Sequence, residues 1–232
     1  MLRTRPPAVV IAARIAQFVK GLRTARARRR ATALTVGVLL SMTACSSGPD
    51  NAAKLDPRLQ QMVPTGTATA ALTARDGQPA ETRQVTSKYF SMYVPANFQE
   101  TSVPMANGEQ MVAFDAPSSN PATPVRVAVV PDSKAKTTAI EQSYDVELTQ
   151  QSKGLKNLTR TMVKWPGAQS AVLLQWTETP AGALATDEPQ RNAQLMAQVN
   201  DHLIVNILAF APAGEFDTAG LATIVETFRP RA

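Results

Sequence analysis

The sequence predicts an α+β protein in which a mainly antiparallel sheet is covered by two helices, preceded by a signal peptide and a flexible tether. Three observations predict it: β-prone segments separated by turn residues, two stretches of helical period, and a basic then apolar leader before the only cysteine, Cys45. We therefore expect a signal peptide over 1–44, a lipidated N-terminus and tether over 45–85, and one domain over 86–232.

The leader has the layout of a lipoprotein signal peptide. Residues 1–30 contain nine Lys or Arg residues and no Asp or Glu, and the following "ATALTVGVLLSMTA" carries no charge. This apolar core is shorter than the roughly 20 residues that span a bilayer. Met42-Thr43-Ala44-Cys45 resembles the bacterial lipobox, with Met42 at the usual position of leucine. The resemblance implies cleavage between Ala44 and Cys45, acylation of Cys45 with palmitate-type chains, and anchoring to the extracytoplasmic face of the cell membrane.

Three features of this leader leave alternatives open. The leader is long because it includes residues 9–25. Either these residues form an amphipathic basic helix on the inner leaflet, or translation starts downstream of them. Arg28, Arg29 and Arg30 permit a twin-arginine interpretation, but the Phe-Leu pair that follows such arginines is missing. Cys45 is alternatively a small buried thiol, although its position behind the leader favours the anchor.

Cleavage of the leader changes the sign of the net charge. The whole chain has 24 Lys and Arg against 18 Asp and Glu, and the leader holds nine of the cations, so the mature chain has 15 cations against 18 anions. A basic chain suggests a nucleic-acid partner, but here the excess positive charge belongs to the removed segment. We therefore expect no nucleic-acid partner.

A spacer follows Cys45. Residues 45–85 are rich in Ala, Thr, Pro and polar residues, with only scattered large apolar side chains. Such a composition buries too little surface to offset the entropy of ordering, so we expect a flexible tether, with a short helix around residues 56–62 as an option.

The domain begins with three strands and a helix. Bulky or alternating apolar residues predict strands over 88–95, 109–117 and 124–132. The period then becomes helical over 137–154, where Gly154 marks the end. Thr138 and Glu141 are spaced as a capping box, and an apolar stripe is formed by Ile140, Tyr144 and Leu148.

Strands return after that helix. Two are predicted over 158–165 and 170–179, separated by the turn dipeptide Pro166-Gly167. A hairpin is predicted over 191–212, with Asn200-Asp201 as its two-residue turn.

A second helix closes the chain within "EFDTAGLATIVETFRP", residues 215–230. Asp217 is its expected N-cap, with Phe216 and Leu221 at hydrophobic-staple spacing, and Pro230 ends it. Its apolar stripe consists of Leu221, Ile224, Val225 and Phe228.

This order of elements resembles a known family. A bulky strand followed by "VPANF", a central helix, strand pairs and a final "EFDTAGLATIVETFR" are similar to the Mog1/PsbP-like α-β-α sandwich, over residues 86–230. With the lipobox and tether, the chain most resembles the actinobacterial LpqN/LpqT-type lipoproteins. The resemblance implies this fold, a cell-envelope location, and roles in binding and assembly.

Catalytic chemistry finds little support among the residue types. His202 is the only histidine and lies beside the predicted hairpin turn, and no Gly-x-Ser-x-Gly motif accompanies it. One histidine and a lipidated cysteine cannot hold zinc, and no phosphate-cradling or dinucleotide-binding glycine motif is present, so we expect no metal and no cofactor. Glu141 and Asp145 lie four apart on the predicted helix, and Asp115 ends a strand; a solvated helix face and a turn are the favoured interpretations of these carboxylates.

Two further sets of side chains are candidates for ligand binding. The cations are dispersed and either meet phospholipid headgroups or form a solvated face, the favoured interpretation: Lys153, Lys156, Arg160 and Lys164. The aromatic residues are most simply buried in the domain, although a groove lined by some of them would suit a lipid, glycan or peptide: Trp165, Trp176, Tyr89, Tyr93 and Phe210. No catalytic or ligand-binding residue is nominated beyond the lipidated Cys45.

Two functions therefore remain. The favoured one is a non-enzymatic, lipid-anchored binding or assembly module of the cell envelope whose protein, lipid or glycan partner is unknown. The alternative is an envelope hydrolase that uses carboxylate acid/base chemistry, which requires two carboxyl groups within about 10 Å of each other in a concave site.

Overall fold

The computed structural model describes residues 62–64, 72–117, 124–155, 157–179 and 188–232. All of these belong to a single unit that spans residues 62–232. The predicted signal peptide, Cys45, Lys156 and most of the predicted tether lie outside the described residues, so their assignments stay predictions.

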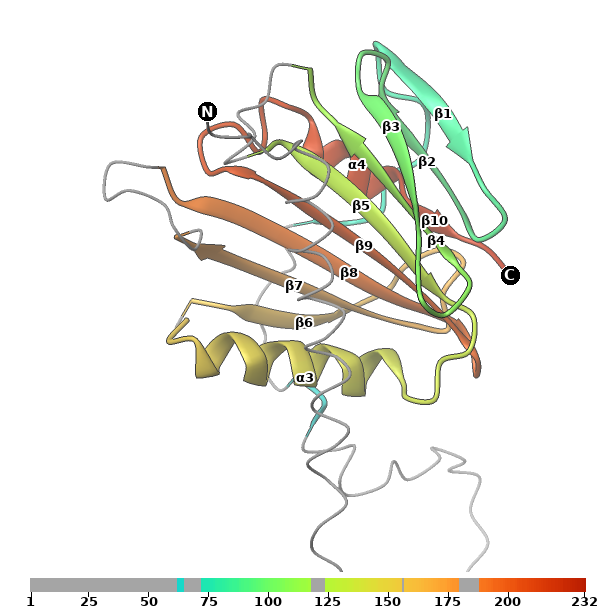
Figure 1. Ribbon diagram of the computed structural model, residues 1–232, viewed down its shortest axis with the longest axis vertical. Coiled ribbons are helices and arrows are strands. Elements are labelled where there is room, and N and C mark those ends of the chain that lie inside the picture. The colour runs from blue at the N-terminus through green and yellow to red at the C-terminus, as the bar shows by residue number, and fades with distance from the viewer. Residues whose placement is uncertain (1–61, 65–71, 118–123, 156, 180–187) are drawn as a thin grey trace, which may run out of the picture. The chain divides into compact units, whose positions relative to one another are not determined.

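Ten antiparallel strands in the described part of the chain form two sheets (Figure 1). The larger has seven strands in the order β3-β4-β5-β9-β8-β7-β6 and the smaller has three in the order β1-β2-β10. The strands of the larger sheet are β3 (Gln99–Pro104), β4 (Gln110–Asp115), β5 (Arg126–Asp132), β6 (Thr159–Val163), β7 (Ser170–Glu178), β8 (Gln190–Asn200) and β9 (Leu203–Pro212). Those of the smaller sheet are β1 (Thr82–Thr86), β2 (Phe90–Pro95) and β10 (Arg229–Pro230).

The two helices cover opposite faces of the larger sheet. Helix α4 (Leu221–Thr227) packs on β2, β5 and β9, and helix α3 (Ala139–Ser152) packs on β7 and β8 (Figure 1). Because side chains alternate along a strand, each face takes every second residue. We call the α4 side the core face, exemplified by Leu173, Leu195 and Ile207, and the α3 side the amide face, exemplified by Asn192, Gln194 and Asn206.

The core lies between the core face, α4 and the smaller sheet. Its largest fully buried aromatic side chains are Phe90, Phe114, Phe216 and Phe228. The end of the chain ties these layers together, because β10 pairs with β2 and the Trp165 Nε1–H donates to the Phe228 carbonyl at 2.8 Å. The predicted α+β class, with two helices on a mainly antiparallel sheet, is confirmed.

Several local predictions are also confirmed. The Thr138–Glu141 capping box is complete: the Glu141 N–H donates to Thr138 Oγ1 at 3.2 Å, and the Thr138 N–H donates to Glu141 Oε2 at 2.8 Å. Gly154 follows the helix with φ of 85° and Gly167 forms its turn with φ of 84°, conformations that glycine adopts without a steric penalty.

Three strands were missed, and one of them moves the start of the folded part. Strand β1 lies inside the segment predicted as tether, and Leu72 before it is only 3% exposed, so packed residues begin before residue 86. Strand β3 is polar and almost wholly exposed at the sheet edge, and β10 has two residues. Such strands are short or polar and show no apolar alternation, so no local pattern reveals their pairing: β1 with β2, β3 with β4, and β10 with β2.

The buried side of α3 was predicted wrongly. The stripe expected to face the sheet includes Leu148, which is 43% exposed, while Ile140 and Tyr144 are half-buried. The helix instead buries Ala139, Gln142, Ser143, Val146 and Gln150. Polar side chains therefore face the sheet, against the usual rule for an amphipathic helix.

Two predicted ends shift by a few residues. The β8–β9 turn is Asp201-His202, because Asn200 pairs with Leu203 and its Oδ1 accepts from the backbone N–H groups of His202 and Leu203. Helix α4 begins after Gly220, which has φ of 74° and offers no side-chain cap, so Asp217 is not the N-cap.

Candidate functional site

The histidine lies in a pocket that is built from two connections. The β5–α3 connection and the β8–β9 turn line a pocket of about 710 Å³, to which His202, Lys134, Lys136 and Glu141 contribute. The His202 carbonyl accepts from the Ala135 N–H at 2.9 Å, which holds the two connections together. The imidazole is exposed, and the Glu141 carboxylate already accepts from the helix N-cap. The hydrogen bonds that the structure shows at this pocket therefore join parts of the fold to one another.

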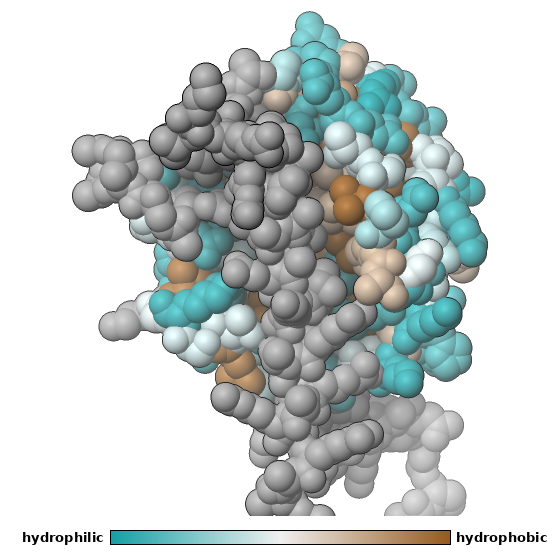
Figure 2. All heavy atoms as spheres, in the orientation of Figure 1, coloured by the Kyte–Doolittle hydropathy of each residue, from teal (hydrophilic) through white to brown (hydrophobic). Residues whose placement is uncertain are grey.

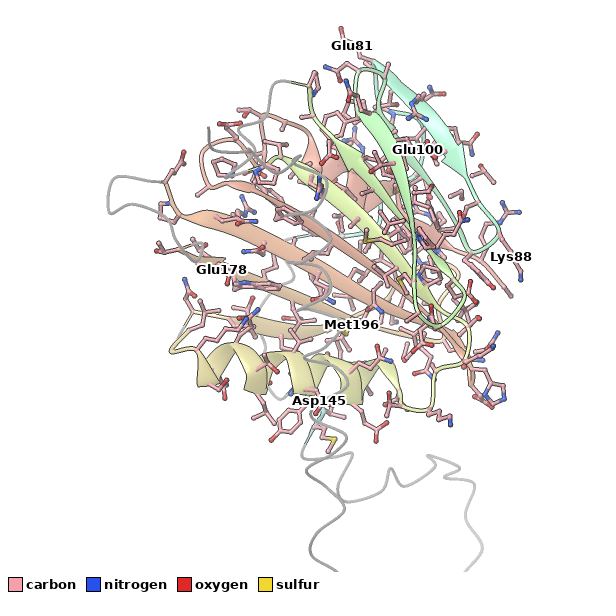
Figure 3. All side chains as sticks on the ribbon, in the orientation of Figure 1. Glu81, Lys88, Glu100, Asp145, Glu178 and Met196 are labelled. Atoms are coloured by element: carbon pink, nitrogen blue, oxygen red, sulfur yellow. The ribbon has the colours of Figure 1, made fainter. Side chains whose placement is uncertain are left out.

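Of the three candidate carboxylates, Asp115 lies at the end of β4, apart from Glu141 and Asp145 on α3. Asp115 forms a two-pronged ion pair with Arg126, its cross-strand neighbour, whose Nη2 lies 2.9 Å from Asp115 Oδ2. Glu141 caps α3. Asp145 lies one turn further along and projects from the side of α3 that points away from the sheet (Figure 3). Asp115, predicted as a turn residue, therefore belongs to a partly buried ion pair.

Arg160, on the edge strand β6, contacts side chains of α3 and does not form part of a cationic surface. Its Nε lies 2.7 Å from Glu147 Oε2, its guanidinium lies 5.3 Å from the centre of the Tyr144 ring, and it also donates to the Met62 carbonyl. Its side chain is only 7% exposed, whereas Lys153 and Lys164 are exposed. The structure does not bring these cations together as a headgroup-binding cluster.

Three of the five aromatic residues have structural contacts. Trp165 is buried and bonded to Phe228. The Tyr93 backbone N–H donates to Thr227 Oγ1 at 3.2 Å. Lys88 Nζ donates to the Tyr89 hydroxyl at 3.0 Å, and this bond is the main cause that raises the pKa of Lys88 above its usual 10.5; the Tyr89 hydroxyl in turn donates to Glu109 at 3.2 Å.

Trp176 and Phe210 both lie on the amide face, with strand β8 between them. Asn192 separates them in the register, with Trp176 opposite it on β7 and Phe210 opposite it on β9. Trp176 is 4% exposed and its Nε1–H has no hydrogen-bond partner. Phe210 is half-buried and lies opposite Arg126.

The amide face buries polar side chains, some of which have no hydrogen-bond partner. Strand β8 places Gln190, Asn192 and Gln194 on this side, all less than a tenth exposed, and Met196 follows them beside α3 (Figure 3). Both polar atoms of the Gln194 side chain lack a hydrogen-bond partner. One sign of this row is visible in the sequence, the amides at three successive alternate positions 190, 192 and 194, but a polar row on a strand normally indicates a solvent-exposed face.

Two searches of the described residues bear on metals and membranes. Among the residues that the structure places, no group of three or more His, Cys, Asp or Glu side chains is arranged to hold a metal ion. None of the helices described is long and apolar enough to cross a bilayer. On the surface seen in Figure 2, hydrophobic residues of the described part form only small patches between hydrophilic ones.

No protein-family model matches the chain, and no curated protein matches it either. Solved structures that are similar include PsbP of the cyanobacterium Synechocystis sp. PCC 6803, at 13% identity over 68% of this chain and 97% of that one, with a TM-score of 0.44. LpqN of Mycobacterium tuberculosis, described as involved in cell envelope biogenesis, is 14% identical over 62% of this chain and 83% of that one, with a TM-score of 0.41. A structure from Bacteroides thetaiotaomicron is 14% identical over 66% of this chain and 49% of that one, with a TM-score of 0.40. The proposals below rest on the residues of this chain.

Proposed function

We propose that the chain is a lipid-anchored lipoprotein of the bacterial cell envelope, held by Cys45 on the outer face of the cytoplasmic membrane. Its folded unit acts there as a non-enzymatic binding or assembly module, and the residues between Cys45 and that unit act as the spacer. The observation that carries the proposal is the tetrapeptide Met42-Thr43-Ala44-Cys45, directly behind a basic segment and a short apolar core.

The side chains of the folded unit support binding over catalysis. Acids that a hydrolase would use are engaged in the fold: Glu141 in the helix cap and Asp115 in the pair with Arg126. The buried polar groups that lack partners are amides and an indole. Amides donate and accept hydrogen bonds and an indole N–H donates, and neither group changes its protonation state near neutral pH, so both suit recognition better than acid–base chemistry.

Metabolic labelling with palmitate tests the anchor. The full chain, expressed in a bacterial host that processes lipoproteins, should incorporate the label and migrate as the cleaved form. Cys45→Ala should abolish labelling and leave the longer precursor, because the sulfur is the only thiol of the chain. Met42→Leu is the matched control: it restores the usual lipobox leucine and should keep the label. Equal labelling of Cys45→Ala and the unsubstituted chain would refute the anchor.

Amide substitutions test the non-enzymatic assignment. Glu141→Gln and Asp145→Asn keep the shape of each side chain while removing its acid, and a binding module should tolerate both. Loss of the cellular phenotype in either variant, with folding and partner capture unchanged, would instead show that the carboxylate is catalytic.

A further inference from the structure

The large apolar side chains that stay exposed in the described part of the chain lie on two neighbouring elements. Leu148 on α3 is 43% exposed, and Met162 on β6 is 37% exposed. Strand β6 is one end of the seven-stranded sheet, and α3 runs beside it (Figure 1). The ion pair of Arg160 with Glu147 joins the two elements directly. The exposed apolar side chains therefore belong to one edge of the fold.

Both side chains lie on the same side of the sheet. Arg160 reaches α3 from β6, and Met162 two residues later points to that side too, because side chains alternate along a strand. On α3, Leu148 lies one turn beyond Tyr144, whose ring centre is 5.3 Å from the Arg160 guanidinium. We call Tyr144, Leu148 and Met162 the α3–β6 patch.

The folded unit begins at the same patch. Met62 is the first residue of that unit, and its carbonyl accepts from the Arg160 guanidinium. Residues 46–61, 16 in number, separate Met62 from Cys45 and reach at most about 55 Å when fully extended. An anchor at Cys45 would therefore pull on the folded unit at the α3–β6 patch and not at the β3 end of the sheet.

The size of the patch favours a lipid surface over a protein as its partner. Two exposed large side chains fall far short of the roughly 1,000 Å² that a stable protein–protein interface buries. They would also hold an untethered protein on a membrane only weakly. A lipid on Cys45 makes the membrane contact intramolecular, at an effective concentration on the order of millimolar, so a weak contact is enough.

The side chains around the patch have the chemistry of a membrane interface. Tyr144 combines an aromatic ring with a hydroxyl group, a combination that is enriched at the level of lipid headgroups. Lys153 at the end of α3 and Lys164 after β6 are both exposed. These two lysines do not form a cluster, yet each is attracted to an anionic membrane surface.

We propose that the α3–β6 patch is the face of the folded unit that rests on the membrane, with Leu148 and Met162 inserted among the lipid headgroups. The inference rests on the proposed function, since the lipid on Cys45 supplies the tether. It leaves the β3 end of the sheet directed away from the bilayer, toward any partner of the module.

Quenching by labelled lipids tests this orientation. Gln151→Cys places a thiol on the exposed side of α3, one turn beyond Leu148, and an environment-sensitive NBD fluorophore is attached to it. Acylation of Cys45 consumes its sulfur, so the introduced cysteine is the only free thiol. The lipidated chain is reconstituted in vesicles of phosphatidylethanolamine and phosphatidylglycerol that contain nitroxide-labelled lipid. The lipid should quench the fluorophore at residue 151.

The matched reporter is Thr101→Cys on β3. Thr101 is exposed, and β3 is separated from β6 by six strand spacings, which is roughly 30 Å. A fluorophore at this position should keep its intensity in the same vesicles.

Polar substitutions then test the two apolar side chains. Leu148→Gln combined with Met162→Gln should reduce quenching at residue 151 by roughly threefold or more, because it removes the groups that enter the lipid. Both positions are exposed, so the fold should be retained, as circular dichroism will check. Val103→Gln on β3 is the control and should leave quenching at residue 151 unchanged.

Three results would overturn the proposal. One is quenching at residue 101 equal to that at residue 151, or none at residue 151. Another is quenching that Leu148→Gln with Met162→Gln leaves unchanged. The third is a blue shift at residue 151 without quenching, which would show that protein covers the patch: a second copy if the shift grows with protein density in the vesicle, and the chain itself if it does not.

Failure of the anchor gives a different signature. NBD labelling of the chain without an introduced cysteine would show that the Cys45 thiol is free, and would overturn the anchor together with this inference. A Cys45 that is blocked, in a chain whose residue 151 is not quenched, would overturn the membrane-facing patch alone.

Discussion

The two faces of the seven-stranded sheet are made by alternate residues of the same strands, yet they differ in kind. On β8 the core face receives Ala193, Leu195 and Ala197, all fully buried among other apolar side chains. The amide face of that strand receives Asn192 and Gln194, which are equally enclosed but only partly hydrogen-bonded. Burial alone therefore does not identify the part of the sheet that stabilises the protein; the chemistry of what is buried does.

The comparison predicts its largest effect for matched phenylalanines on the two faces. Phe114 on the core face is fully buried, and Phe210 on the amide face is half-buried. Phe114→Ala should lower the free energy of unfolding by about 3–5 kcal/mol, since it leaves a cavity in close-packed surroundings. Phe210→Ala should cost less than half as much, measured by urea denaturation of both variants. Equal losses would show that the amide face stabilises the fold as strongly as the core face.

A smaller effect is expected at the ion pair on the rim of the amide face. The Arg126 side chain is 7% exposed and that of Asp115 is 22% exposed. Asp115→Leu should cost roughly 2–4 kcal/mol, because it leaves a buried guanidinium without its carboxylate.

The double variant Asp115→Leu/Arg126→Met is the control for that experiment. It should recover much of the loss, because an apolar pair often replaces a buried ion pair at little cost. A double variant no more stable than Asp115→Leu would argue that the two side chains act independently.

The smallest effect belongs to a charge outside both faces. Lys88 is exposed, and its hydrogen bond with Tyr89 raises its pKa above 10.5. A raised pKa means that the bond stabilises the fold fully below pH 10.5, and that this contribution disappears as the pH rises through the folded-state value. The small difference in unfolding temperature between the unsubstituted chain and Lys88→Met should therefore be constant from pH 7 to about 9 and vanish at higher pH. A difference that persists unchanged into strong alkali would exclude the Lys88–Tyr89 bond as its cause.

Sequence reasoning was most accurate where local chemistry decides the structure. The Thr138–Glu141 cap, the turn at Gly167 and the strands around Val127 and Leu173 follow from side chains that interact with their own segment or alternate along it. It failed where pairing, and not the strand's own apolar pattern, decides. Strand β1 has no apolar alternation and exists through its pairing with β2, the next strand along the chain.

The candidate site shows the same division. Amides at alternate positions of β8 indicate a solvent-exposed face of the sheet. No local pattern in the sequence reveals that α3 buries Gln150 and exposes Leu148. Which side of the helix is buried depends on the sheet beneath it. The identity of Cys45 as the lipidated residue, in contrast, rests on the sequence alone and awaits its experiment.

The pairing of β10 with β2 has a consequence for the order in which the protein can fold. Strand β2 begins at residue 90, whereas its second neighbour in the smaller sheet lies at Arg229 and Pro230, with all seven strands of the larger sheet between them in the sequence. A chain that emerges N-terminus first, from a ribosome or through a membrane, therefore cannot complete this sheet or the Trp165–Phe228 bond until residues 228–230 have emerged. Strand β2 and Trp165 have to wait for β10, so the smaller sheet is completed only after every strand of the larger one has been made.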